Sequence, residues 1–82
     1  MNYSELFSMR IKELCEKRGI TINRLATLSG LKQSSIDNII HGASKNPKVR
    51  TLHKISNTFN MTLAEFMDFP ELNEYEPEDE EY

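Results

Sequence analysis

The chain has 82 residues, of which 38% are hydrophobic and 28% charged, and this composition fits one small globular domain. No apolar run approaches the roughly 20 residues of a membrane span, and the N-terminus lacks a signal peptide's apolar segment, so we expect neither. The single cysteine excludes an internal disulfide and fits a reducing compartment, which favours a cytoplasmic protein. Few residues remain for a catalytic cleft once a core has formed, and we do not expect an enzyme.

Charge is divided unevenly along the chain, although the net formal charge is only −3. Up to residue 70, ten Lys and Arg residues outnumber six Asp and Glu residues, which leaves this part at +4. The last twelve residues hold seven acidic residues and no basic one. We therefore expect a basic domain over residues 1–70 and an acidic tail over residues 71–82 that is disordered in isolation.

The first predicted helix follows from apolar residues at helical spacing. Phe7, Ile11 and Leu14 fall on one stripe, while the charged residues Glu13, Glu16 and Lys17 lie elsewhere. Ser4 is the expected N-cap, and Gly19 has the residue type that commonly ends a helix.

Two short helices and then two more complete the predicted bundle. The second helix begins after Thr21 and ends at Gly30, and the third spans residues 33–40. A polar loop precedes a fourth helix over residues 49–60, and Pro70 is expected to end a fifth. No segment alternates apolar and polar residues long enough to predict a strand. The expected fold class is all-α, a compact five-helix bundle with an acidic C-terminal tail.

The most informative stretch is ITINRLATLSGLKQSSIDNIIHG, residues 20–42. Two helices that cross near a right angle over a short turn need a small residue where they approach, and Ala26 suits that position. Gly30 can adopt the positive φ that such a turn requires, and Ile36 can fill the corner from the second of the two helices. The pattern predicts a helix-turn-helix with these three residues as its structural positions.

Helical geometry then separates the inward from the outward side of the third helix. At about 100° per residue, the side opposite Ile36 is polar. It holds Ser34, Asp37, Asn38 and His41. Gln33 lies in the first turn, and its carboxamide can pair with N6 and N7 of adenine, as Asn38 can one turn further along. In an isolated helix the same residues would be interpreted as a merely solvated face.

Over residues 7–67 the chain resembles the phage-repressor/Cro-like helix-turn-helix family, often called the XRE family. The matching stretches are FSMRIKEL, RGIT, LATLSGL followed by QSSI, GASKNP and TLHKISNTFNMTLAEFM. The resemblance implies a five-helix fold of the lambda-repressor-like type whose third helix enters the DNA major groove. It implies base contacts at Gln33, Ser34 and Asn38.

The resemblance also implies contacts with the DNA backbone, from the start of the second helix and from the loop after the third. The candidates are Asn23, Ser44, Lys45, Asn46, Lys48 and Arg50. These residues should set affinity and its salt dependence and not the choice of sequence. Without the motif, a lysine-rich loop would indicate solubility as readily.

Two further candidates for base contacts depart from the family pattern. Lys32 stands where relatives have a Ser or Thr N-cap, so it is either a ligand for a phosphate or a guanine edge, or a tolerated cation. Asp37 can accept a hydrogen bond from a cytosine amino group, or it can tether Lys32 or Gln33. Both of its roles stay open at this point.

Two more departures affect the surroundings of the motif. Ile22 replaces a glutamine that contacts the backbone in relatives. Arg10 lacks the acidic partner of the family because Ile40 stands in its place, which leaves Asp68, the tail or solvent. His41 and the other histidine have no neighbouring Cys/His cluster, so no metal site and no cofactor are expected.

The sequence therefore predicts a DNA-binding transcriptional regulator, a repressor of the phage or mobile-element kind. Its expected partner is double-stranded DNA with a palindromic operator, bound by a homodimer in the bacterial nucleoid. The expected dimer interface is the last helix and the tail, and the observation behind it is the cluster of Phe66, Met67 and Phe69 just before the acidic run. The alternative is a protein-interaction module, such as an antitoxin or adaptor, that binds a partner through the acidic tail.

Overall fold

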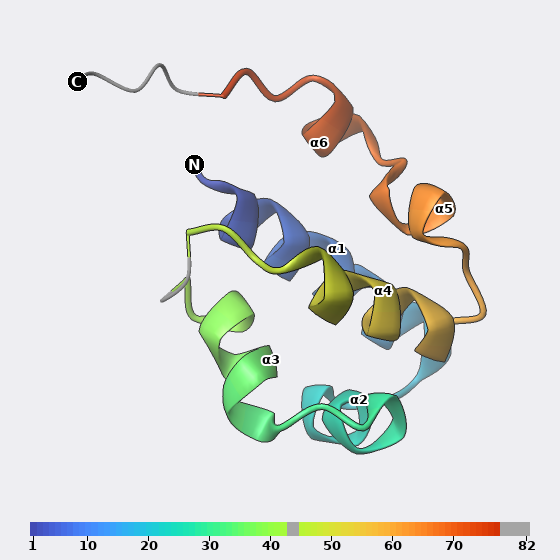
Figure 1. Ribbon diagram of the computed structural model, residues 1–82. Coiled ribbons are helices and arrows are strands. Elements are labelled where there is room, and N and C mark those ends of the chain that lie inside the picture. The colour runs from blue at the N-terminus through green and yellow to red at the C-terminus, as the bar shows by residue number, and fades with distance from the viewer. Residues whose placement is uncertain (43–44, 78–82) are drawn as a thin grey trace.

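The computed structural model describes residues 1–42 and 45–77. These residues form six helices and no strand (Figure 1). The helices are α1 (Tyr3–Arg18), α2 (Ile22–Ser29), α3 (Gln33–Ile40), α4 (Val49–Thr58), α5 (Leu63–Met67) and α6 (Pro70–Asn73). The all-α class is confirmed, and α6 is an addition to the five predicted helices. Within the described ranges, none of the helices has the length and apolarity to cross a membrane.

Local capping sets where the helices begin and end. Ser4 as N-cap of α1 is wrong, because the cap is Asn2, whose side chain accepts from the Glu5 backbone N–H at 2.9 Å. Asparagine is among the best N-cap residues, and the earlier start lets Ser4 and Leu6 turn into the core. The cap at Thr21 is confirmed, since its hydroxyl accepts from the Arg24 backbone N–H at 3.0 Å.

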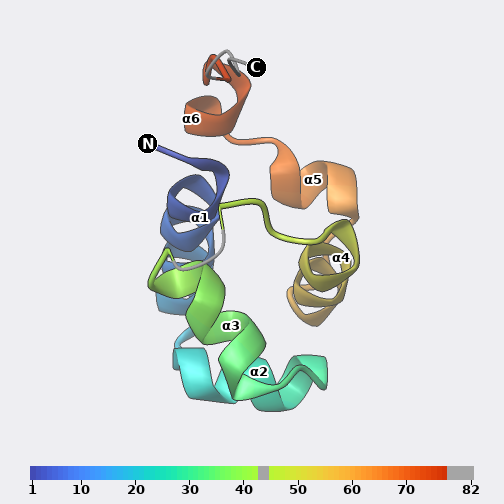
Figure 2. The same ribbon diagram turned by 60° about the vertical axis from the view of Figure 1, so that its left-hand side comes forward.

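The core lies between α1 on one side and α4 and α5 on the other, with α2 and α3 closing one end (Figure 2). The stripe predicted for α1 is buried as expected. The core residues are Leu6, Phe7, Ile11, Leu14, Cys15, Leu25, Ala26, Ile36, Ile39, Leu52, Ile55, Phe59, Phe66 and Phe69. Because α1 contacts α2, α3 and α6, it holds the helix-turn-helix against the C-terminal part of the chain.

The α2–α3 junction has the burial and the backbone geometry that the motif requires. Ala26 and Ile36 are buried, and Gly30 adopts a left-handed conformation with φ of 71°. The Leu31 backbone N–H donates to the Ala26 carbonyl at 3.1 Å, which closes the turn. These contacts fix the direction of α3 relative to the body of the protein.

The C-terminal helix continues the fold beyond the expected end. Pro70 does not stop the chain's helical structure but opens α6, because proline fits the first helical position, where no N–H is needed. Leu72 and Tyr75 pack against the core, and the Tyr75 hydroxyl donates to the Met1 carbonyl at 2.7 Å. Residues 78–82 of the predicted tail lie outside the described residues, and the domain boundary at residue 70 stays a prediction.

Arg10 finds its partner in the main chain of α5. Its Nε donates to the Phe66 carbonyl at 2.9 Å and its Nη2 to the Glu65 carbonyl at 3.0 Å. The guanidinium also lies 5.3 Å from the centre of the Phe69 ring. The described contacts of Arg10 are therefore with main-chain carbonyls in the last turn of α5 and not with the Asp68 carboxylate, and the Glu65 carbonyl also accepts from the Asp68 backbone N–H.

The same packing overturns the reason for placing a dimer interface at the aromatic cluster. Phe66 is 0% and Phe69 4% exposed, and both rings lie 5.9 Å from the Phe7 ring, centre to centre. Of the three residues named for that interface, only Met67 is partly accessible. Two of them are core residues of the monomer.

Candidate nucleic-acid interface

The candidate interface begins with the outward side of α3. Gln33, Ser34 and Asn38 are exposed, while Ile36 and Ile39 on the opposite side are buried. The polar residues therefore project from a helix whose other side is fixed in the core. This is the separation of sides that the sequence predicts.

Asp37 and Gln33 form one unit on this surface. The Gln33 Nε2 donates to the Asp37 Oδ1 at 2.9 Å, so of the roles left open for Asp37 the structure shows the tether to Gln33. A carboxylate only accepts hydrogen bonds, which requires the nitrogen of the amide and not its oxygen to face Asp37. Gln33 is left with one N–H and its carbonyl oxygen for a further partner.

Neither α3 nor α4 has a side-chain cap at its N-terminus. Their N-cap residues are Lys32 and Lys48, and neither side chain accepts from the following turn. By contrast, α1, α2 and α5 are capped by Asn2, Thr21 and Thr62. A cation at a helix N-terminus adds positive charge where the helix dipole is already positive, so these two ends favour an anion.

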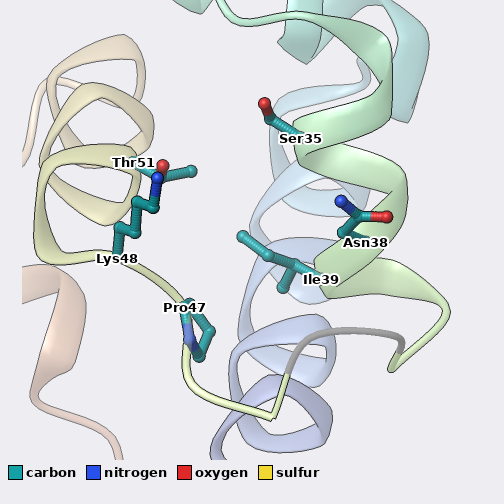
Figure 3. Close-up of a pocket in the computed structure, with 6 residues that line it drawn as sticks. All are labelled: Ser35, Asn38, Ile39, Pro47, Lys48 and Thr51. Carbon is teal, nitrogen blue, oxygen red and sulfur yellow. The ribbon is translucent and has the colours of Figure 1, made fainter.

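Two grooves run between α3 and α4 and share part of their lining. The first, of about 180 Å³, lies where α3 side chains face α4 (Figure 3). Its lining is Ser35, Asn38, Ile39, Pro47, Lys48 and Thr51. The second, of about 370 Å³, lies against the α2–α3 turn. Its lining is Gly30, Leu31, Lys32, Ser35, Lys48, Arg50, Thr51 and Lys54. None of the described lining residues is acidic.

The remaining candidates for backbone contacts flank α3. Asn23 is exposed in the first turn of α2, and Lys45 and Asn46 are exposed in the loop before α4. Ser44 lies outside the described residues. Ile22, which stands in place of the family's glutamine, packs against the core, so this position contributes to packing.

Lys54 is the residue of this surface that the sequence analysis missed. It lines the second groove together with Arg50, which stands four positions earlier on the same side of α4. That spacing places two cations one helical turn apart and was the available signal.

Comparison with known proteins agrees with this geometry. The family model of the Cro/C1-type HTH DNA-binding domain matches residues 10–77. The chain is 42% identical over 60 residues to the HTH-type transcriptional regulator SlrR of Bacillus subtilis (strain 168), covering 72% of this chain and 40% of SlrR. It is 33% identical over 63 residues to the HTH-type transcriptional repressor RghR of the same organism, covering 77% of this chain and 47% of RghR. It therefore spans less than half of each relative.

A solved structure extends the likeness to the fold. The crystal structure of the prophage Lp1 protein 11 superposes with a TM-score of 0.81 at 38% identity, covering 92% of this chain and 100% of that one. The helix-turn-helix, its buried junction and the exposed polar side of α3 thus occur in a chain that the family model matches over most of its length. The chain belongs to the Cro/C1-type helix-turn-helix family, a family of DNA-binding domains and not of enzymes.

Proposed function

We propose that the protein is a sequence-specific transcriptional regulator, a repressor of the phage or mobile-element kind, that inserts α3 into the DNA major groove. The observation that carries the proposal is the exposed row of Gln33, Ser34 and Asn38 on a helix fixed by Ala26 and Ile36. The relatives named above as transcriptional regulator and repressor, and the prophage origin of the similar structure, support the biological role.

In this proposal the interface divides into two kinds of contact. Gln33, Ser34 and Asn38 contact base edges, with Asp37 orienting Gln33 and with Lys32 at the helix start. The backbone is held by a second set of residues: Asn23, Ser44, Lys45, Asn46, Lys48 and Arg50. The first set selects the sequence, and the second supplies affinity that falls with salt.

We propose further that the protein binds a palindromic operator as a homodimer, in the cytoplasm and associated with the nucleoid. One recognition helix contacts too few base pairs to select a site among roughly a million competitors, whereas two helices one DNA turn apart can. Analytical ultracentrifugation of the protein, free and on a palindromic duplex, tests this point. A monomer in both samples would remove the dimer from the proposal.

Substitutions of Gln33 and Lys45 should weaken DNA binding in different ways, and this difference tests the placement of α3. Replacing Gln33 with Ala should cost about 1–3 kcal/mol of binding free energy on the cognate duplex and little on random DNA, because it removes a base contact. Lys45→Ala should weaken both duplexes alike and lower the salt slope by about one unit, because it removes a phosphate contact. The measurement is fluorescence anisotropy at several salt concentrations, with the cognate duplex selected from a random pool.

The opposite result would favour the interaction module described above. If Gln33→Ala lost affinity equally on every sequence, or lost none, α3 would not contact bases. If the wild-type protein bound neither duplex even at low salt, the fold would be a scaffold for a protein partner, with the acidic tail as the candidate contact.

A further inference from the structure

Four cations gather on the groove between the α2–α3 turn and α4. Its lining includes Lys32, Lys48, Arg50 and Lys54. Lys32, Lys48 and Arg50 are exposed, and Lys54 is half-buried. Over residues 1–42 and 45–77, none of the four has an ion-pair partner, whereas Lys17 on α1 pairs with Glu13 at 3.0 Å.

This arrangement opposes folding unless an anion compensates it. Like charges brought to one groove repel each other, and no described acidic side chain lines the groove to offset them. Lys32 and Lys48 also stand at the uncapped N-termini of α3 and α4, where the helix dipoles add positive potential. The charges, the hollow and the two helix ends all favour the same kind of ligand, a phosphate-like anion.

The position of the groove indicates which phosphate-like anion would bind there. Ser35, Lys48 and Thr51 line both this groove and the one that Asn38 lines, so the two form one trough along the flank of α3. A DNA strand that borders the major groove entered by α3 passes along such a flank, with its phosphates toward the protein. A continuous basic trough fits a phosphodiester chain better than it fits a single small anion.

We infer that the groove formed by the α2–α3 turn and α4 is a DNA-backbone site in which Lys54 and Arg50 bind phosphate beyond the loop contacts of Lys45 and Asn46. The inference rests on the proposed function, because it takes α3 to lie in the major groove. It assigns Lys54, on the middle of α4, to the interface.

The test compares charge removal inside the groove with charge removal outside it. Lys54→Met removes the charge and keeps a long apolar side chain, Lys54→Arg keeps the charge, and Lys12→Met removes an exposed charge on α1 as the matched control. Anisotropy titrations of the full chain on cognate and random duplexes at several salt concentrations give the salt slope. Thermal unfolding of each variant shows whether the fold is retained.

Lys54→Met should lower the salt slope by about one unit on both duplexes, while Lys54→Arg and Lys12→Met keep the wild-type slope. The melting temperature of Lys54→Met should stay the same or rise, because one of four like charges in the groove has gone.

An unchanged slope for Lys54→Met, beside a lowered slope for Lys45→Ala, would overturn the assignment of the groove to the DNA backbone and leave the proposed function standing. Charge-dependent binding of a polyglutamate peptide, with the DNA slope unchanged, would assign the groove to an acidic protein. No DNA binding by the wild type would remove both proposals.

Discussion

At the scale of single residues, the orientation of the Gln33 amide decides which base it can accept. One of its N–H groups is held by Asp37, so the amide offers one donor and one acceptor. Adenine presents the complementary pair at N7 and N6, whereas guanine presents two acceptors at N7 and O6. The carboxylate that looks unsuitable beside DNA thus explains how Gln33 would favour adenine.

Substitutions of Asp37 should therefore change sequence preference more than fold. Asp37→Ala frees the second N–H and lets the amide turn, so the preference for adenine over guanine at that base pair should fall about tenfold. Asp37→Asn retains an oxygen that can accept from Gln33 and should keep most of the preference. Anisotropy with two duplexes that differ in one base pair measures the ratio of affinities for adenine and guanine. If this ratio in Asp37→Ala equalled the wild-type ratio, Asp37 would not position Gln33.

At the scale of elements, different hydrogen bonds hold the two ends of α5. At its start, Thr62 and Glu65 form a capping box in which the Thr62 N–H donates to the Glu65 carboxylate at 2.8 Å. This hydrogen bond, with a second from the Thr62 hydroxyl, lowers the pKa of the Glu65 carboxyl below its ordinary value. At its end, two carbonyls accept from Arg10. A helix of five residues could not persist alone, so these contacts define it.

The capping box gives stability that depends on pH. Because the pKa of Glu65 is lower in the folded state, its contribution is complete above the ordinary carboxyl pKa and is lost as pH falls through the folded value. Glu65→Ala should lower the melting temperature at pH 7, and its difference from the wild type should shrink toward pH 3. Thr62→Ala should cost about 0.5–2 kcal/mol of unfolding free energy. Calorimetry at both pH values checks this, and a Glu65→Ala difference independent of pH would refute the assignment.

The elements also show what sequence can and cannot predict here. The limits of α2 and α3, their junction and the polar side of α3 follow from local spacing and from caps such as Thr21, and these predictions agree with the structure, whereas the start of α1 and the presence of α6 do not follow from such signals. The partner of Arg10 and the burial of Phe66 depend on contacts across more than fifty positions, which no local pattern reports. The grooves were missed for the same reason, since they join α3 to α4.

At the scale of the whole molecule, the two ends of the described chain meet. The Tyr3 and Tyr75 rings pack edge to face with centres 5.1 Å apart, and Tyr75 also binds the Met1 carbonyl. The α6 helix thereby closes the bundle over α1, at the end away from α2 and α3 (Figure 1). This closure thus lies away from the helix-turn-helix that carries the proposed base contacts (Figure 1).

Weakening this closure should affect unfolding and not DNA binding. Leu72→Ala removes a half-buried side chain and should lower the free energy of unfolding by about 1–2 kcal/mol. Met9→Ala, which truncates a side chain of α1 that is 44% exposed, should have a smaller effect. Urea unfolding gives both values, and anisotropy at low temperature should give wild-type affinity for each. A loss of affinity in a folded Leu72→Ala protein would contradict this separation.

The Arg10 contact has a consequence for how the surface of α5 can vary. Arg10 binds carbonyl groups, which every amino acid supplies, and it depends on no particular side chain at residues 65 and 66 for its acceptors. An exposed position of this region such as Ala64 can therefore exchange charge or size while the anchor persists. Related chains could in this way acquire new partners at α5 and still keep the joint between the first helix and the C-terminal half.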